Sequence, residues 1–112
     1  MYIIHITGKE LDEIRRKGRA ELYREKTECN AGMFMGIFGT VWVEQQQKQY
    51  VIPDTTGQER KPIELRAEYG KQIQKIWAEC SLSAGYGREK WGAEPGKEYY
   101  ILTIEDIGGM QL

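Results

Sequence analysis

Acidic and basic side chains gather in the stretch "PDTTGQERK" at residues 53–61. Asp54 follows a proline and Glu59 stands two residues before Lys61, so the stretch matches a P-D…E-x-K pattern. In metal-dependent nucleases with this pattern the two carboxylates share a Mg²⁺ ion, while the lysine supports the attacking water. That geometry needs the second half on a strand beside the first, whereas both halves here have the composition of one loop. A metal-dependent nuclease is therefore the least favoured hypothesis.

A second pattern, K-x-x-E-x-R, is formed by Lys61, Glu64 and Arg66 and is associated with small RNA-binding β-barrels. A strand would place Glu64 and Arg66 on one face. The apolar spacing after Pro62 instead predicts a long amphipathic helix over 62–80, where first-turn glutamates complement the helix dipole. This pattern is thus interpreted as structural. The apolar positions of that helix are Ile63, Ala67, Ile73, Ile76, Trp77 and Cys80.

The segment "KGRAELYRE" is the better candidate for a binding site. Basic residues cluster around it, aromatic rings could stack on bases, and the cations that precede the last strand could contact phosphates. The alternative is structural: basic residues are common in the exposed last turn of a helix, and the rings could cover the edge of the core. The candidate binding residues are Arg16, Lys17, Arg19, Glu21, Tyr23, Arg24, Tyr86, Arg88, Lys90 and Trp91.

The spacing of apolar residues, together with capping and turn residues, predicts the helices and strands that position these side chains. A buried strand is expected at 2–6, and Thr7 with Glu10 forms a capping box for a helix over 9–17 that ends at Gly18. His5 on that first strand is interpreted as a core histidine. The remaining predictions are strands at 19–25, 32–44, 49–52 and 98–107, the helix over 62–80, and loops at 53–61 and 81–97 with one helical turn near 88–91.

The resulting order, β-α-β-β-β-α-β, predicts a single α+β domain over 1–112 with a curved, mostly antiparallel sheet and one long amphipathic helix. In this order the chain resembles the ASCH/PUA-like family of small β-barrels. The resemblance rests on the strand, short helix, Gly18 and "RAELYRE" strand, and on "KIWAECSLSAGYGREKWGAEPGKEYYILTIEDI", which is similar to the family's helix, loop, Gly-Lys and closing strand. It covers most of the chain in topology.

The resemblance implies a cleft between the first helix, the Glu21–Arg24 strand and the glycine-rich loop before the last strand. The sequence departs from the family at two points, because no lysine follows Gly18 and the strand carries E-x-x-R in place of E-x-R. That spacing puts Glu21 and Arg24 on opposite faces of a strand. The Lys/Thr pair with which family members hydrolyse amides has no match here, so the resemblance implies binding rather than catalysis.

Composition narrows the function classes. With 16 basic and 17 acidic residues the formal net charge is −1, which argues against a protein that binds mainly duplex phosphate. One histidine and two cysteines are too few for a Cys/His metal centre, and no cofactor is expected. No apolar run approaches membrane-spanning length, so a cytoplasmic protein without a membrane partner is expected.

Two functions therefore remain open from the sequence. The favoured one is a small PUA-like domain that binds RNA or a nucleotide base without clear catalytic machinery. The alternative is a compact protein-binding module, such as a phage- or mobile-element-encoded inhibitor of a host defence nuclease. The sequence leaves the ligand and the oligomeric state undetermined.

Overall fold

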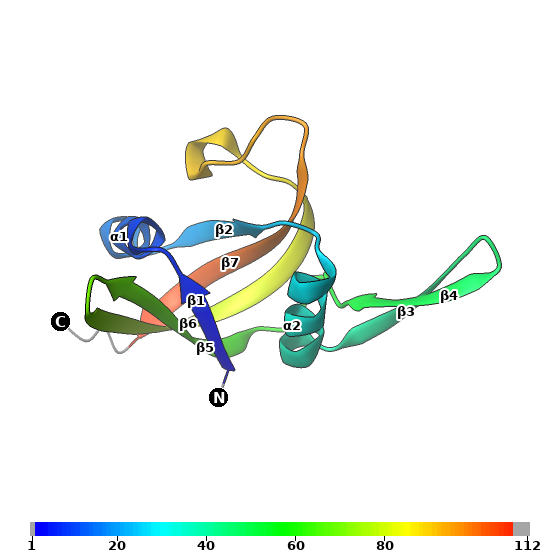
Figure 1. Ribbon diagram of the computed structural model, residues 1–112, viewed down its shortest axis with the longest axis horizontal. Coiled ribbons are helices and arrows are strands. Elements are labelled where there is room, and N and C mark those ends of the chain that lie inside the picture. The colour runs from blue at the N-terminus through cyan, green and yellow to red at the C-terminus, as the bar shows by residue number, and fades with distance from the viewer. Residues whose placement is uncertain (1, 109–112) are drawn as a thin grey trace.

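In the computed structural model, which describes residues 2–108, a mostly antiparallel sheet combines with two α-helices in a mixed α+β fold (Figure 1). The elements in chain order are β1 (Tyr2–Ile6), α1 (Gly8–Lys17), β2 (Ala20–Arg24), α2 (Glu28–Phe38), β3 (Thr40–Gln45), β4 (Lys48–Pro53), β5 (Lys61–Tyr69), β6 (Gln72–Tyr86), the 3₁₀ turn η1 (Glu89–Trp91) and β7 (Glu98–Gly108).

The main sheet has five strands in the order β1-β5-β6-β7-β2. All its pairings are antiparallel except that of β1 with β5. The sheet is curved but not closed, because β1 and β2 form its two edges. The structure therefore does not confirm the PUA-like barrel that the resemblance implies. It does confirm the coarser prediction of an α+β fold with a curved, mostly antiparallel sheet.

Helix α1 lies between the two edge strands in sequence, and its boundaries are those that the sequence predicts to within a residue. The Thr7 hydroxyl accepts the Glu10 N–H at 3.0 Å, while the Glu10 carboxylate accepts the Thr7 N–H at 2.9 Å. Gly18 ends the helix with φ of 73°, a left-handed conformation that favours glycine. Leu11 and Ile14 are fully buried, so this helix covers part of the core.

The helix predicted over 62–80 is wrong, because the segment forms the hairpin of β5 and β6. Buried apolar residues alternate with a period of two on both strands, which is the strand pattern. They are Ile63, Leu65 and Ala67 on β5, and Ile76, Ala78, Cys80 and Leu82 on β6. Gly70, which lies within the predicted helix, provides a positive φ of 62° in the turn between the strands. Strand β6 also continues to Tyr86, into the predicted loop.

The curved strand predicted over 32–44 is also wrong, because its first half lies in helix α2. The Thr27 hydroxyl caps this helix by accepting the Asn30 N–H at 3.1 Å. Phe34, Ile37 and Phe38 are buried at helical spacing, and Phe34 packs edge-on against Tyr100 of β7. Burial of these rings stabilises the helix despite the two glycines inside it.

Strands β3 and β4 form a separate hairpin that projects from the body of the molecule, and we call residues 40–53 the arm (Figure 1). Gln46 and Gln47 both have positive φ, 51° and 64°, as a two-residue hairpin turn requires. The hairpin turn therefore lies in the polar residues between the strands predicted at 32–44 and 49–52. The radius of gyration is 14.6 Å, above the roughly 13 Å of a compact chain of this length, because the arm extends outward.

Candidate functional site

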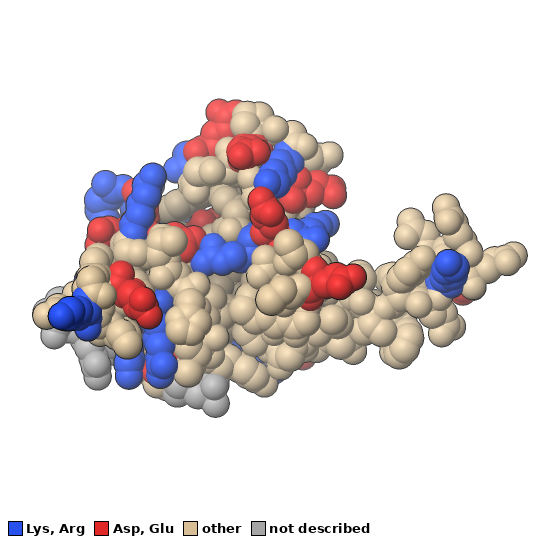
Figure 2. All heavy atoms as spheres, in the orientation of Figure 1, with Lys and Arg blue, Asp and Glu red and all other residues tan. Residues whose placement is uncertain are grey.

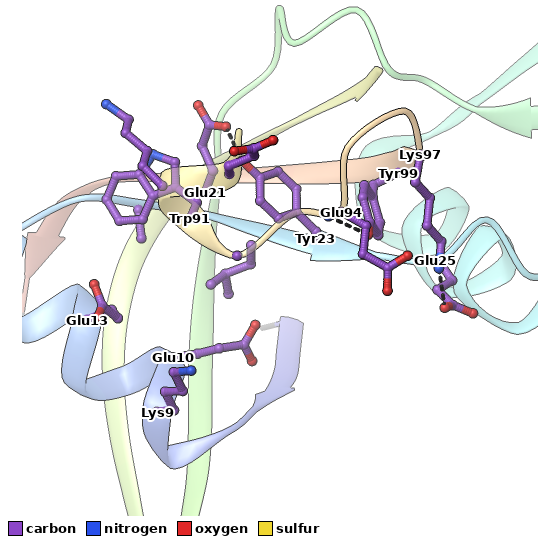
Figure 3. Close-up of a pocket in the computed structure, with 15 residues that line it drawn as sticks. Lys9, Glu10, Glu13, Glu21, Tyr23, Glu25, Trp91, Glu94, Lys97 and Tyr99 are labelled. Carbon is purple, nitrogen blue, oxygen red and sulfur yellow. Dashed lines mark hydrogen bonds and ion pairs between the residues drawn. The ribbon is translucent and has the colours of Figure 1, made fainter. Parts of the chain in front are cut away.

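A cavity of about 580 Å³ lies between α1, β2 and the loop that joins β6 to β7 (Figure 3). Carboxylates, lysines and aromatic rings make up most of its lining. Glu10 and Glu13 project from α1, and Glu21 and Tyr23 lie across from them on β2. The cavity lies where the resemblance to ASCH/PUA-like barrels implies a cleft, between the first helix, the second strand and the glycine-rich loop.

Glu21 and Tyr23 share one face of β2 because two residues separate them along a strand. The Tyr23 hydroxyl donates to Glu21 Oε1 at 2.8 Å and accepts the Arg88 N–H at 2.8 Å. Burial, together with the hydrogen bond to Glu21, raises the pKa of Tyr23 to about 12, against the opposing effect of the Arg88 N–H. The hydroxyl therefore stays protonated and holds the Glu21 carboxylate in place.

A second tyrosine holds the other end of the loop. The Tyr99 hydroxyl accepts the Glu94 N–H at 3.2 Å, and the Tyr99 and Tyr23 ring centroids are 5.3 Å apart. Gly87 passes so close that a Cβ there would meet Tyr23 Cε1 at 2.9 Å and the Ala93 Cβ at 2.4 Å. The loop wall of the cavity is thus fixed against two packed aromatic rings.

The opposite wall is fixed by an ion pair between α1 and β2. Arg24 binds Glu10 with both guanidinium nitrogens, Nη1 to Oε2 at 2.8 Å and Nη2 to Oε1 at 3.0 Å. Burial acts to raise the pKa of Glu10, but hydrogen bonds from Arg24 and Thr7 outweigh it and hold the pKa below its usual value. Arg24 Nη2 also reaches the His5 carbonyl at 3.3 Å, so one side chain contacts both edge strands and α1.

Trp91 of η1 lines one end of the cavity and packs against the hydrophobic core. The Lys17 ammonium lies 4.2 Å from its ring centroid and the Lys90 ammonium 5.8 Å from it, both at cation–π distance. At the other end Lys97 pairs with Glu25 at 2.7 Å. The aromatic ring and the carboxylates therefore border the same space.

No protein-family model, curated protein or solved structure matches this chain.

The cavity is not the basic cleft expected from the sequence. Its lining holds six glutamates and three lysines. Arg16 pairs with Glu13, and Arg24 with Glu10, so two of the expected cations neutralise carboxylates of the lining. Arg88 Nε lies 3.8 Å from Glu21 Oε2. Three of the arginines predicted as binding residues therefore lie beside glutamates of the cavity lining instead.

The structure brings only some of the ten candidate residues to the cavity. Glu21, Tyr23, Lys90 and Trp91 line it, and Lys17 and Arg88 contact lining residues. Arg19 is exposed and does not line it. Tyr86, at the end of β6, is 67% exposed and also lies outside it.

Several lining residues were missed by the sequence interpretation, namely Lys9, Glu10, Glu13, Glu25, Glu89, Glu94, Lys97 and Tyr99. Glu10 was recognised only as a capping residue, although its spacing from Glu13 places both on one face of α1. Tyr99 lies within the strand predicted at 98–107, for which the sequence suggests no binding residue. No sequence signal links these residues, because their proximity depends on the pairing of β2 with β7.

The residues of the nuclease-like pattern have other partners. Asp54 accepts hydrogen bonds from the Thr56 N–H at 3.0 Å and hydroxyl at 2.8 Å, and Glu59 pairs with Lys61 at 3.2 Å. Within residues 2–108 no three His, Cys, Asp or Glu side chains group as a metal site would require. Glu64 and Arg66 do share a strand face and form an ion pair, contrary to the helical interpretation.

His5 is exposed, so its prediction as a core histidine is wrong; the neighbouring Ile4 and Ile6 point inward instead. Among the described residues, neither helix has the length and apolar character needed to cross a bilayer.

Proposed function

We propose that the protein binds a nucleobase in this cavity, either of a free nucleoside or of an unpaired nucleotide in single-stranded RNA. The observation that carries the proposal is the presence of aromatic rings beside hydrogen-bond-accepting carboxylates in a cavity of about 580 Å³. A volume of this order suits a small organic ligand. Flat nitrogenous rings are the ligands that aromatic side chains stack on and that polar edges recognise.

Glu21 is the residue we expect to recognise the base. Its Oε1 accepts a hydrogen bond from the Tyr23 hydroxyl. Its Oε2 has only the 3.8 Å contact with Arg88 and can accept a further hydrogen bond. Carboxylates accept hydrogen bonds from the exocyclic amino groups of bases, as in contacts of Glu with cytosine N4. Cytosine, adenine and guanine carry such a group and uracil does not. We therefore expect amino-bearing bases to bind more tightly than uracil.

The acidic lining favours contact through the base rather than through a chain of phosphates. Because six glutamates repel a polyanion, we expect the affinity to depend only weakly on salt. Arg88 and Lys90 are exposed beside the cavity and could contact the phosphate of a bound nucleotide. This proposal includes no catalytic residue.

The decisive comparison uses cytidine and uridine titrated calorimetrically into the wild type and into Glu21→Gln. The substitution keeps a carbonyl to accept the Tyr23 hydroxyl but removes the charge. We expect cytidine binding to weaken by about tenfold or more, and uridine binding to change little. Tyr86→Ala serves as the control, since Tyr86 is an exposed aromatic residue outside the cavity.

Two further measurements distinguish a free nucleoside from single-stranded RNA as the ligand. Single-stranded oligocytidine that binds much more tightly than cytidine identifies RNA as the ligand, whereas equal affinity identifies the free nucleoside. Absence of binding by any nucleoside or single-stranded RNA at millimolar concentration overturns the proposal. So does a polyamine that binds in a Glu21-dependent manner while nucleosides do not, because the cavity would then be an organic-cation site.

A further inference from the structure

The arm holds five of the ten large apolar residues that are exposed in the described part of the chain. Its exposed large apolar side chains are Val41, Trp42, Tyr50, Val51 and Ile52, each at least 36% exposed. Figure 2 shows the arm as an almost uncharged projection, whereas the body carries intermixed acidic and basic residues. A two-stranded ribbon by itself is only marginally stable in water, so these side chains call for a partner.

The chemistry of the arm excludes two kinds of partner. Its only charged residues are Glu44 and Lys48, which is too little positive charge for a nucleic acid backbone. Its apolar residues lie along the stem, while residues 44–49 at the tip are all polar, the reverse of a loop that inserts into a membrane. A protein surface is the remaining class of partner.

The register of the hairpin assigns side chains to its two faces. Val41 pairs with Ile52 and Val43 with Tyr50, so these four share one face, which we call the valine face. Trp42 and Val51 pair on the opposite face. The valine face therefore has two successive apolar cross-strand pairs, followed towards the tip by Lys48 paired with Gln45.

The valine face complements a copy of itself. Two arms can stack with their valine faces together and their strands running in opposite directions. The two-fold axis that relates them then runs across the ribbon, midway between the Val41–Ile52 and Val43–Tyr50 pairs. In this arrangement Tyr50 of each copy faces Ile52 of the other. Val41 likewise faces Val43. The same rotation brings Lys48 to the end of the second copy's β4, where Asp54 follows. Lys48 forms no ion pair within the described part of the chain.

We infer that the arm is a self-association surface, and that two copies of this chain form a symmetric dimer by stacking their valine faces. The antiparallel arrangement places the two bodies at opposite ends of the paired arms. A two-fold axis needs only one self-complementary patch, which is why symmetric dimers are the commonest assemblies. This inference does not depend on the ligand of the cavity.

Mass measured by light scattering across a concentration series tests the inference. The wild type is expected to show the dimer mass, and Tyr50→Glu to weaken dimerisation by about thirtyfold or more, as loss of a central interface residue does. Tyr86→Glu is the matched control, because Tyr86 is at least as exposed as Tyr50 but lies on the body. Circular dichroism verifies that each variant is folded.

Charge reversal tests the orientation of the two arms. Lys48→Glu places a carboxylate opposite Asp54 of the second copy and is expected to weaken the dimer by about three- to tenfold. Adding Asp54→Lys to the same chain reverses both charges and is expected to restore it. A wild type that remains monomeric at about 100 µM, equal dimerisation of Tyr50→Glu and wild type, or no rescue by the double reversal overturns the inference.

Discussion

Arg24 of β2 holds Glu10 of α1 in a two-bond ion pair, with nitrogen–oxygen distances of 2.8 and 3.0 Å. The two residues stand 14 positions apart, and the same guanidinium contacts the carbonyl of His5 on the far edge strand. Arg24 thus links the edge strand β2 to α1 and to β1, the other edge of a sheet that is not closed. It also fixes the α1 wall of the cavity against the β2 wall.

Loss of this pair should cost more stability than loss of a surface pair. We expect Arg24→Ala to lower the free energy of unfolding by about 1–3 kcal/mol, because a half-buried carboxylate is left without its partner. Arg16→Ala removes a more exposed partner of Glu13 and should cost under about 1 kcal/mol. Urea denaturation of both variants measures the difference. Equal losses would show that the Arg24 pair is an ordinary surface contact.

The same pair predicts a dependence of stability on pH. The pKa of Glu10 in the folded protein lies below the unfolded value of about 4.5, so the unfolded state binds the proton first as the pH falls. The contribution of Glu10 is therefore fully present above pH 4.5 and is lost as the pH falls through the folded-state pKa. Glu10→Gln should be less stable than wild type at pH 7, and the gap should narrow towards pH 3. A gap that stays constant between these pH values contradicts the assignment.

Gly87 should tolerate no side chain. We expect Gly87→Ala to cost about 1–3 kcal/mol, because the new methyl group collides with Ala93 and the Tyr23 ring. Gly36→Ala is the matched control, since a Cβ there meets nothing within 4 Å and alanine favours helix α2. Thermal unfolding compares the two, and amide hydrogen exchange at residues 88–94 reports whether the loop loosens. Protection unchanged in Gly87→Ala would mean that the loop is not held by this contact.

Burial on β5 and β6 gives a test that separates the strand structure from the helical interpretation. Leu65 is fully buried and Ile73 is 58% exposed. Leu65→Ala should therefore lower the free energy of unfolding by about 2–5 kcal/mol, and Ile73→Ala by under about 0.5 kcal/mol. The helical pattern predicts burial of Ile73, so a large loss at that position would favour it. Chemical denaturation of the two variants is sufficient.

The N-terminal elements could be predicted from sequence because their signals are local. The capping box of Thr7 and Glu10 and the stop at Gly18 act within one helix and do not depend on tertiary contacts. The last strand was equally clear from its alternation of Tyr100, Leu102 and Ile104.

The middle of the chain could not be predicted, because similar apolar residues fit either period. Ile63, Ala67 and Ile73 coincide with helical spacing, whereas the buried Leu65, Ala78 and Leu82 reveal alternation. Helix α2 was not predicted, because its glycines lower helix propensity and the β-branched residues that follow it favour a strand. In both cases tertiary burial decided the structure.

The resemblance to ASCH/PUA-like barrels implies a cleft at the location of the cavity, but the charge of the cavity could not be predicted. The sequence shows Arg16 and Arg24 as free cations, and only the packing of α1 against β2 reveals that Glu13 and Glu10 neutralise them. Ion pairs between distant segments leave no local signal, so a basic cleft was expected where an acidic one stands.

The strand order also constrains how the chain folds. Strands β5, β6 and β7 form successive antiparallel neighbours, so they can assemble from contacts between adjacent segments. The two edges come from the opposite end of the sequence: Tyr2 pairs with Ile63, and Ala20 with Ile104. Closing such long loops costs entropy before any contact forms. We therefore expect docking of β1, α1 and β2 onto a preformed three-stranded meander to be the slow event of folding, with the cavity as the last part of the molecule to take shape.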